Sequence, residues 1–246
     1  MKGIVLAGGT GKRLYPLTKV TNKHLLPVYD EPMIFKPIKT LRDSGIMDIT
    51  VVLGGESIGD VVRVLGNGSE LGVRLSFVYQ EAPRGIADAL FTTRDLCAGQ
   101  KIAVILGDNI YEDTFAAQAE AFEAEPGTEC YLFLKEVENP AEFGVALLDG
   151  TTIIDIEEKP ADPKSSMAVT GLYFYDTTVF DRIEGLIAAN AYSARGELEI
   201  TTLNMLYVQD RMAKAFFIEH FWSDAGTIDT LLSTSNYLAG LRGKWM

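Results

Sequence analysis

The stretch Lys2–Arg13, KGIVLAGGTGKR, decides the fold because it joins an apolar run directly to a glycine-rich loop. Its first part, Lys2–Ala7, predicts a short strand that is buried on both faces. Three glycines within residues 8–11 then end the strand, and they allow the backbone to approach a phosphate and direct N–H groups at it. Arg13 adds a guanidinium that can hold phosphate oxygens through two hydrogen bonds. The stretch therefore predicts an anion-binding loop after a first buried strand.

Two familiar nucleotide-binding motifs do not fit this loop. A Walker loop requires GxxxxGK followed by Ser or Thr, whereas Leu6 stands at the first glycine position and Arg13 follows Lys12. A dinucleotide fingerprint GxGxxG that starts at Gly9 has Leu14 in place of its last glycine. The loop is thus a phosphate-binding loop of another class or a glycine turn with solvated charges.

Further along the chain, apolar strands alternate with helical patterns. In the first half the predicted strands are Lys2–Ala7, Ile49–Leu53, Val73–Gln80 and Ile102–Leu106, and the predicted helices are Pro32–Ser44, Ile58–Leu65 and Ile86–Cys97. Gly45 is expected to cap the first helix. This alternation predicts an α/β fold with a Rossmann-like, mixed but mostly parallel sheet flanked by helices. Ligands bind outside the carboxyl ends of such strands, where Gly8, Gly54, Gln80 and Asp108 stand.

After about residue 128 the pattern changes to short strands separated by turns, which predicts inserted antiparallel strands. The predicted strands here are Cys130–Lys135, Gly144–Leu148, Thr152–Glu157 and Ala168–Tyr175, and the predicted helices are Thr177–Ala189, Leu198–Gln209 and Thr227–Leu241. The sequence contains no Ser/Pro-rich linker, low-complexity tract or internal repeat. We therefore expect residues 1–246 to form a single domain with halves of about 1–128 and 129–246.

The composition excludes several classes of protein. The chain has 246 residues and a formal net charge of -12, which opposes binding to nucleic acid. No apolar stretch approaches the 18 or so residues of a membrane span, so no membrane association is expected. The two cysteines, Cys97 and Cys130, match no metal or redox spacing. We expect them to be buried thiols in a cytoplasmic protein.

The charge is unevenly distributed along the chain. Residues 1–30 contain five basic side chains and one acidic side chain, a local net charge of +4 that leaves -16 for the remaining residues. Such a cationic segment in an acidic chain suggests that a small anionic ligand is held in one place. Lys23 and His24 belong to this segment. Taken alone, Lys23 is explained equally well as a solvated loop lysine, and His24 is more often a structural histidine than a base.

From Leu6 to Val28 the chain resembles the N-terminal signature of the sugar-phosphate nucleotidyltransferase family, LxGGxGxRLxPLTxxxxKxLLPV. Later segments that resemble family motifs follow in the same order: Leu106–Asn109, Phe143–Val145, Glu157–Pro160, Val169–Tyr175, Ser193–Thr201 and Trp222–Thr227. The resemblance covers almost the whole chain and is specific to the glucose-1-phosphate thymidylyltransferase branch. His24 and the short C-terminus look like the short form of that branch.

The resemblance implies a Mg²⁺-dependent, homotetrameric enzyme that converts dTTP and α-D-glucose 1-phosphate into dTDP-glucose and pyrophosphate, for deoxysugar synthesis of the dTDP-rhamnose type. A sugar phosphate is already an anionic nucleophile, so the reaction needs alignment and charge neutralisation rather than a general base. Three alternatives stay open: a UTP-dependent enzyme, an enzyme for another hexose 1-phosphate, and a nucleotide-sugar sensor without turnover.

The resemblance also assigns roles to residues of this chain. It implies that the catalytic residues are Arg13, Lys23, Asp108 and Lys159. The implied nucleotide-binding residues are Leu6, Ala7, Gly8, Gly9, Thr10, Gly11, Arg13, Lys23, His24, Gln80, Gly85 and Asp108. The implied sugar-phosphate-binding residues are Asn109, Gly144, Glu158, Lys159, Val169, Tyr173 and Arg195. Asp108 and Asp224 are the implied metal ligands, and carboxylate oxygens suit Mg²⁺.

Base and sugar choice are assigned less directly. The carboxamide of Gln80 can pair with both the donor and the acceptor edge of a pyrimidine, and Gly85 would admit the base closely, which favours thymine or uracil. Asp88 and Phe143 depart from the family pattern. Because Tyr is common where this chain has Phe143, a hydroxyl is missing from the expected sugar pocket. The sequence does not decide between dTTP and UTP, and it does not identify the hexose.

Overall fold

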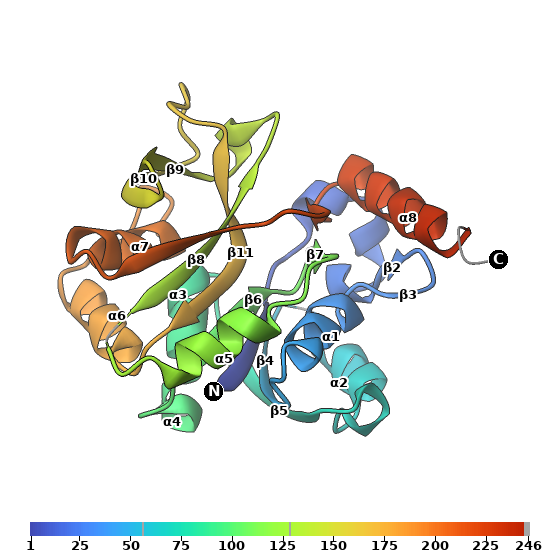
Figure 1. Cartoon of the computed structure of the whole chain (residues 1–246). Coiled ribbons are helices and arrows are strands. Elements are labelled where there is room, and N and C mark those ends of the chain that lie inside the picture. The colour runs from blue at the N-terminus through green and yellow to red at the C-terminus, as the bar shows by residue number, and fades with distance from the viewer. Residues whose placement is uncertain (56, 128, 244–246) are drawn as a thin grey trace.

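The computed structural model describes residues 1–55, 57–127 and 129–243, and within them a nine-stranded mixed sheet forms the centre of the molecule (Figure 1). Its main path runs in the order β10 (Thr152–Glu158), β9 (Gly144–Asp149), β11 (Met167–Tyr175), β6 (Ile102–Leu106), β1 (Lys2–Ala7), β4 (Asp48–Gly54) and β5 (Arg74–Gln80). Two further strands, β8 (Cys130–Glu136) and β12 (Ala213–Phe217), continue from β11. The predicted α/β class with a mixed sheet is confirmed.

The four first-half strands of the central sheet, β1, β4, β5 and β6, are parallel, and β1 lies between β4 and β6. The chain passes from β1 to β4 and β5 on one side and then returns to β6 on the other side of β1. Strand order therefore reverses between β1 and β6, and ligands bind at such switch points in open α/β sheets. Because the strands are parallel, the loops that follow β1, β5 and β6 emerge at the same edge of the sheet.

The sheet is covered by helices on both faces, as the uninterrupted apolar strands predict. In β1, Ile4 and Leu6 join one hydrophobic core while Val5 and Ala7 join the other. The first core is closed by α3 (Ile86–Phe91), α4 (Arg94–Cys97), α6 (Val179–Ala188) and α7 (Ile200–Gln209). The second is closed by α1 (Phe35–Asp43), α2 (Ile58–Leu65) and α5 (Ala116–Ala124).

The predicted antiparallel strands of the second half are present, and β11 organises them. It pairs antiparallel with β6, β8 and β9, and β12 extends the sheet parallel to β8. A separate ribbon joins β7 (Asn109–Tyr111) to β13 (Trp222–Asp224), and another joins β2 (Pro27–Val28) to β3 (Glu31–Pro32). The final helix, α8 (Ile228–Gly243), packs over a small third core. Short 3-10 helices occupy Lys12–Leu14, Leu17–Lys19, Lys23–Leu25, Ser69–Leu71 and Pro140–Glu142.

Local chemistry explains two differences from the predicted helices. The predicted helix Ile86–Cys97 is interrupted at Thr92 and Thr93, whose hydroxyls donate to the carbonyls of Ala89 and Leu90 at 2.6 and 2.7 Å and compete with the helical pattern. The first helix begins only at Phe35, because Pro32 belongs to β3.

The expected cap at the end of α1 is confirmed. Gly45 has φ +85°, and its N–H donates to Arg42 O at 2.8 Å while Ile46 N–H donates to Leu41 O at 3.0 Å. This is the pair of bonds of a Schellman motif, which requires a left-handed residue that glycine supplies without strain.

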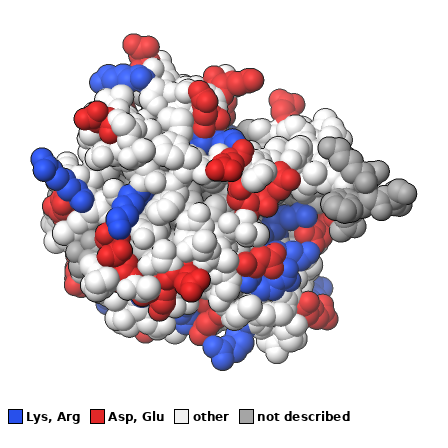
Figure 2. Space-filling view, in the orientation of Figure 1, with Lys and Arg blue, Asp and Glu red and all other residues white. Residues whose placement is uncertain are grey.

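The surface of the molecule carries charges of both signs, and its two thiols are buried. Among the described residues, no helix combines the length and apolar character needed to cross a membrane. Figure 2 shows acidic and basic side chains interspersed over one face of the molecule. Cys97 and Cys130 are buried, as expected, and burial raises the pKa of both thiols.

We expect Phe174→Ala to lower the free energy of unfolding by about 3–5 kcal/mol, because it empties the centre of the second core. Phe174 is fully buried and its ring packs against Phe122, Tyr131 and Phe133. Urea unfolding measures the loss. The matched control is Phe217→Ala on β12, where 47% of the residue is exposed and little change is expected. Equal midpoints for the two variants would contradict this assignment of the core.

Candidate active site

One cavity of about 320 Å³ lies where the carboxyl ends of β1, β5 and β6 face the strands of the second half. The predicted site residues that line it are Leu6, Gly8, Gly9, Arg13, Lys23, Gln80, Gly85, Asp108, Asn109, Gly144, Glu158, Lys159, Val169, Tyr173, Arg195 and Asp224. Four predicted residues are not among the lining residues: Ala7, Thr10, Gly11 and His24. The structure thus brings most of the predicted site together from both halves of the chain.

The glycine loop leaves room for a lysine beneath it. A Cβ atom on Gly9 would lie 2.9 Å from Lys23 Nζ, so a larger residue at this position would displace the ammonium. Gly11 has φ +65°, and its carbonyl accepts a hydrogen bond from the Thr18 hydroxyl at 3.0 Å. The chain then turns so that Leu14 is buried while Arg13 reaches the cavity. These glycines therefore position Arg13 and Lys23.

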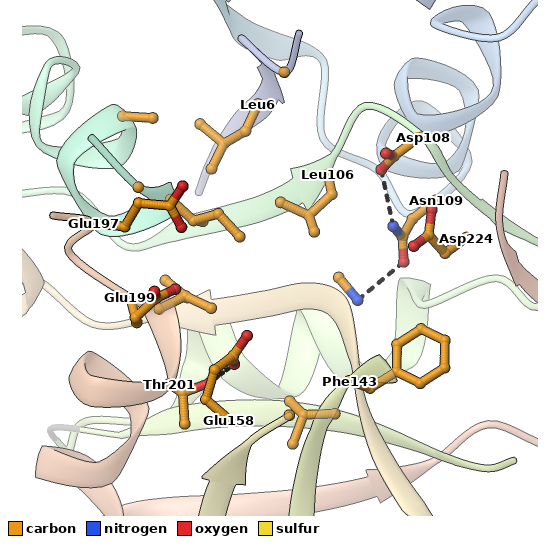
Figure 3. A pocket seen from close by; sticks show the side chains of 18 of the residues that line it. Leu6, Leu106, Asp108, Asn109, Phe143, Glu158, Glu197, Glu199, Thr201 and Asp224 are labelled. Atoms are coloured by element: carbon orange, nitrogen blue, oxygen red, sulfur yellow. Dashed lines mark hydrogen bonds between the residues drawn. The ribbon is translucent and has the colours of Figure 1, made fainter. Parts of the chain in front are cut away.

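Two cations and two carboxylates form a four-charge cluster, defined here as Arg13, Lys23, Asp108 and Asp224. Lys23 Nζ lies 2.5 Å from Asp108 Oδ2, and Arg13 Nη2 lies 3.3 Å from Asp224 Oδ2. The β7–β13 ribbon joins the two carboxylates, since Asp224 pairs with Asn109 and Ala225 N–H donates to Asp108 O at 2.9 Å. Figure 3 shows both carboxylates on the same side of the cavity.

The two carboxylates of the cluster differ in their pKa values. Burial alone would raise the pKa of Asp108, but the Lys23 ammonium holds it well below its usual range. Burial, and then the negative charge of Asp108, raise the pKa of Asp224 to about 6. The two groups therefore repel each other, and a cation placed between them would relieve that repulsion.

The carboxylate pair fits a hard divalent cation. Asp224 Oδ1 is buried and has no hydrogen-bond partner among the described residues, so one ligand oxygen is available. No group of three or more His, Cys, Asp or Glu side chains suited to a metal occurs in residues 1–55, 57–127 and 129–243. Mg²⁺ is commonly held by one or two carboxylates together with substrate phosphates, and this pair matches that pattern.

Asn109 serves the framework of the site. Its Oδ1 accepts from the Gly171 N–H at 3.0 Å, and its Nδ2 donates to Asp108 Oδ1 at 3.2 Å (Figure 3). The same Oδ1 also accepts from Trp222 Nε1 at 2.8 Å. Asn109 therefore ties β7 to β11 and β13 and orients Asp108. A Cβ on Gly171 would lie 2.7 Å from this side chain, which explains the glycine in the middle of β11.

The cationic N-terminal segment is only partly gathered at the cavity. Lys2 lies at the amino end of β1, about 17 Å of extended strand from the loop, where its Nζ is 3.7 Å from Asp48 Oδ1. Lys12 and Lys19 are exposed and do not line the cavity. Of the five basic side chains in the segment, only Arg13 and Lys23 line the cavity, so the local net charge overstates the positive charge available there to an anionic ligand.

His24 is a buried, neutral support for the site. Its Nδ1 is 2.9 Å from Asn22 Oδ1, and this oxygen can only accept, so Nδ1 carries the hydrogen. Burial, and then the charge of Lys23, lower the pKa of His24 to about 3. A Cβ on Gly107 would lie 2.8 Å from His24 Nε2, so the imidazole packs against the turn that leads to Asp108.

A second group of charges lines the opposite side of the cavity (Figure 3). Glu158 Oε2 accepts from the Thr201 hydroxyl at 2.6 Å, and Lys159 Nζ lies 3.5 Å from Glu158 Oε1. Lys159 has φ +46°, a left-handed conformation that is uncommon outside glycine and often found at functional sites. Arg195 lies 2.8 Å from Glu199, and this hydrogen bond raises the pKa of the Arg195 guanidinium.

Aromatic residues complete the walls. Tyr173 is buried against Tyr175, and burial raises its pKa, so its hydroxyl stays neutral. Phe143 lines the cavity beside Trp222, with ring centroids 5.3 Å apart, so an apolar surface stands at the position of the missing hydroxyl.

Gly85 is required for a reason that the sequence did not reveal. A Cβ at this position would lie 2.4 Å from the backbone oxygen of Leu198, and Gly85 has φ +106°. The loop is held there because Leu198 N–H donates to Arg84 O and Ala87 N–H donates to Leu198 O. Close contact with the Leu198 backbone, rather than admission of a base alone, therefore excludes a side chain.

Comparison with known proteins agrees with this geometry. Residues 2–240 match the model of the nucleotidyl transferase family. The chain belongs to this family. It is 39% identical over 241 residues to a glucose-1-phosphate thymidylyltransferase of Neisseria meningitidis, covering 97% of this chain and 82% of the relative. A glucose-1-phosphate thymidylyltransferase of Mycolicibacterium smegmatis is 40% identical over 242 residues, with the same coverage.

Solved structures support the assignment of this nucleotidyltransferase. A Bacillus anthracis protein assigned as a glucose-1-phosphate thymidylyltransferase, crystallised with sucrose, superposes with a TM-score of 0.89 at 45% identity and covers 96% of this chain and 94% of that one. A UDP-glucose pyrophosphorylase complexed with UDP-glucose, at 23% identity and a TM-score of 0.82 over 97% of this chain and 98% of that one, shares the fold.

Sequence reasoning did not assign several residues that line the cavity of this nucleotidyltransferase. They are Pro83, Ile86, Ala89, Leu106, Glu142, Gly171, Glu197, Glu199, Ile200, Thr201, Asn204 and Trp222. Glu197, Glu199 and Thr201 lie within a quoted motif, so their position next to Arg195 was an available signal. Leu106, Ile200 and Trp222 also lie within quoted motifs, but nothing local separates an apolar residue of a cavity wall from one of a core.

Gly85→Ala is expected to lower the free energy of unfolding by more than about 3 kcal/mol, since it combines a strained backbone with a clash against Leu198. The matched control is Gly99→Ala, at φ +72°, where no atom lies within 4 Å of the new Cβ. Only the conformational cost of about 1–2 kcal/mol should remain there. Urea unfolding compares the two, and equal losses would refute the clash.

We expect the free energy of unfolding of His24→Gln to fall less steeply with decreasing pH than that of the wild type. The pKa of His24 in the folded chain is about 3, below the ordinary value of 6.5. Stability is therefore full above pH 6.5 and is lost as pH falls, because the unfolded chain takes up a proton that the folded chain does not. The slope approaches about 1.4 kcal/mol per pH unit between these values. Urea unfolding of wild type and variant at several pH values from 7.5 to 5 measures it.

The other histidine of the chain supplies the control. A hydrogen bond to Asp113 raises the pKa of His220, so its contribution is present below pH 6.5 and is lost as pH rises through the native value. His220→Gln should therefore shift the profile in the opposite direction. Profiles of the His24 variant and wild type that run parallel from pH 7.5 to 5 would contradict a neutral, buried His24.

Proposed function

We propose that this nucleotidyltransferase transfers the deoxythymidylyl group of dTTP to α-D-glucose 1-phosphate and releases pyrophosphate. The observation that carries the proposal is the four-charge cluster beside the glycine loop, which places two cations and two carboxylates where a triphosphate would bind. The names of relatives 39–40% identical to this chain support the choice of substrates.

The reaction needs no proton transfer. An oxygen of the sugar phosphate attacks the α-phosphorus of the triphosphate, a new P–O bond forms, and the bond to the pyrophosphate leaving group breaks. Arg13 and Lys23 are the side chains that would neutralise the triphosphate and the leaving group. Both cations are paired with Asp108 and Asp224, so bound phosphates would compete with the carboxylates for them. The nucleotide's phosphates would rest on the loop of residues 8–11.

Mg²⁺ held by Asp108 and Asp224 would supply further neutralisation at the phosphates. The free Oδ1 of Asp224 supports this placement. Without a cation, this carboxylate oxygen and a bound phosphate would repel each other. A requirement for the metal is therefore part of the proposal.

The opposite wall would hold the second substrate. Lys159 and Arg195 supply positive charge for the sugar phosphate, and Glu158, oriented by Thr201, would accept hydrogen bonds from sugar hydroxyls. Backbone at Gly144 and Val169, with the Tyr173 hydroxyl, would complete the pocket, together with Asn109. These roles follow from the resemblance and from the position of the side chains in the cavity.

We also propose that residues 1–246 form one nucleotidyltransferase domain, with a nucleotide-binding half of about 1–128 and a sugar-binding half of about 129–246. We further propose that the enzyme is a homotetramer in the cytoplasm and that its product is used to make deoxysugars. UTP is the second candidate nucleotide, because uracil and thymine present the same hydrogen-bonding edge to Gln80.

We expect pyrophosphate release from dTTP and glucose 1-phosphate with Mg²⁺, and none after EDTA treatment. Arg13→Ala and Asp108→Asn should each lower kcat by about 10²-fold or more, the scale for losing one electrostatic stabiliser. A coupled pyrophosphate assay across several nucleoside triphosphates and hexose 1-phosphates measures both the reaction and its specificity.

Arg63→Ala and Asp95→Asn are the matched controls for these variants. Both residues lie outside the cavity on the surface, with exposed side chains, and wild-type rates are expected. Absence of pyrophosphate release with every substrate pair would refute the enzyme assignment, and wild-type kcat in the Arg13 or Asp108 variant would refute that residue's role.

A further inference from the structure

The amide of Gln80 is held by two acceptors of the protein. Gln80 is the last residue of β5 and only 6% of it is exposed. Its Nε2 donates to Asp88 Oδ2 at 2.8 Å and to Gly85 O at 3.3 Å. Asp88 belongs to the first turn of α3, so the contact joins the end of the strand to the following helix.

These partners fix which way the amide points. A carboxylate oxygen and a backbone carbonyl oxygen can only accept, so both must face the NH₂ group and not the carbonyl of Gln80. Both amide hydrogens are therefore used within the protein. The expectation that Gln80 pairs with both edges of a pyrimidine needs correction, because only Oε1 is left for a ligand.

The remaining oxygen lies at the glycine loop. A Cβ on Gly8 would be 3.1 Å from Gln80 Oε1, and both residues line the cavity. Asp88 is not one of the lining residues. The side chain of Asp88 thus contacts Gln80 from outside the cavity and would act on a bound base only through it.

We propose that Asp88 is a positioning residue that turns Gln80 so that its oxygen alone faces the base, which selects a pyrimidine carrying a hydrogen on N3. This inference rests on the proposed function and deepens it. Thymine and uracil have an N3–H that donates to Oε1. Cytosine presents a lone pair at N3. Cytosine N3 and Gln80 Oε1 would then be two buried acceptors facing each other, and neither would have a hydrogen-bond donor.

Asp88→Asn tests the proposal with almost no change of shape. The asparagine amide can donate as well as accept, so Gln80 becomes free to turn its NH₂ group toward the base. The readout is kcat/KM for dTTP and for dCTP, with glucose 1-phosphate and Mg²⁺ constant. We expect wild type to favour dTTP and the variant to reduce the dTTP/dCTP ratio by about tenfold or more, the scale for one correctly oriented hydrogen bond.

Two further variants separate positioning from structure. Asp88→Glu retains a carboxylate and should recover most of the wild-type ratio. Asp95→Asn, on an exposed aspartate of α4, should leave the ratio unchanged. Competition of dTDP and dCDP for the Asp88→Asn enzyme gives the same ratio from binding if turnover is too slow to measure.

Three results would overturn the inference. A loss of kcat/KM that is equal for dTTP and dCTP would reduce Asp88 to a structural residue. A wild-type enzyme that prefers dCTP to dTTP would show the opposite polarity at Gln80. A wild-type dTTP/dCTP ratio in Asp88→Ala, which has no carboxylate, would show that the contact between Asp88 and Gln80 is not needed. Failure of wild type to release pyrophosphate with any triphosphate would instead refute the proposed function, and with it the premise of this inference.

Discussion

The site depends on one constraint, the parallel hydrogen bonding of β1 to a neighbour on each side. Because β1 is buried, its backbone donors and acceptors have to be satisfied by other strands. Parallel partners place the loops after β1 and β6 at the same edge, so the glycine loop lies beside Asp108. Antiparallel pairing would send those loops to opposite edges and separate the cations from the carboxylate.

Charge balance explains how so many ionised groups share one place. With all four members ionised, the four-charge cluster is neutral as a set, and pairing offsets much of the cost of removing charges from water. A triphosphate bound there, as proposed, would add several negative charges to this balanced set. The raised pKa of Asp224 indicates that the set already resists further negative charge. An added divalent cation is the simple way to restore neutrality.

The sequence predicts best those features that local patterns determine. Strands β1 and β6 were predicted to the residue, because burial on both faces leaves a continuous apolar run. Helix α5 and strand β12 were not predicted: the former has few buried residues, and the latter is a strand because β8 offers it a partner. In the site, motifs predicted the four lining cations and three of the lining carboxylates, Asp108, Glu158 and Asp224. The reason for Gly85 lies in Leu198, a distant residue that no local pattern connects to it.

The shared strand β11 limits how this enzyme can be recombined with its relatives. Its end, Leu172–Tyr175, pairs with β6, while the same strand also pairs with β8 and β9 in the other half. A chimaera that exchanges only residues after 128 would place a foreign β11 against the native β6. Such crossovers will give folded hybrids only where the donor preserves the register of Leu172 with Ile105 and of Tyr175 with Ile102. The two halves of the chain are thus joined in one continuous sheet, and exchanging either half requires compatible residues where β11 meets β6.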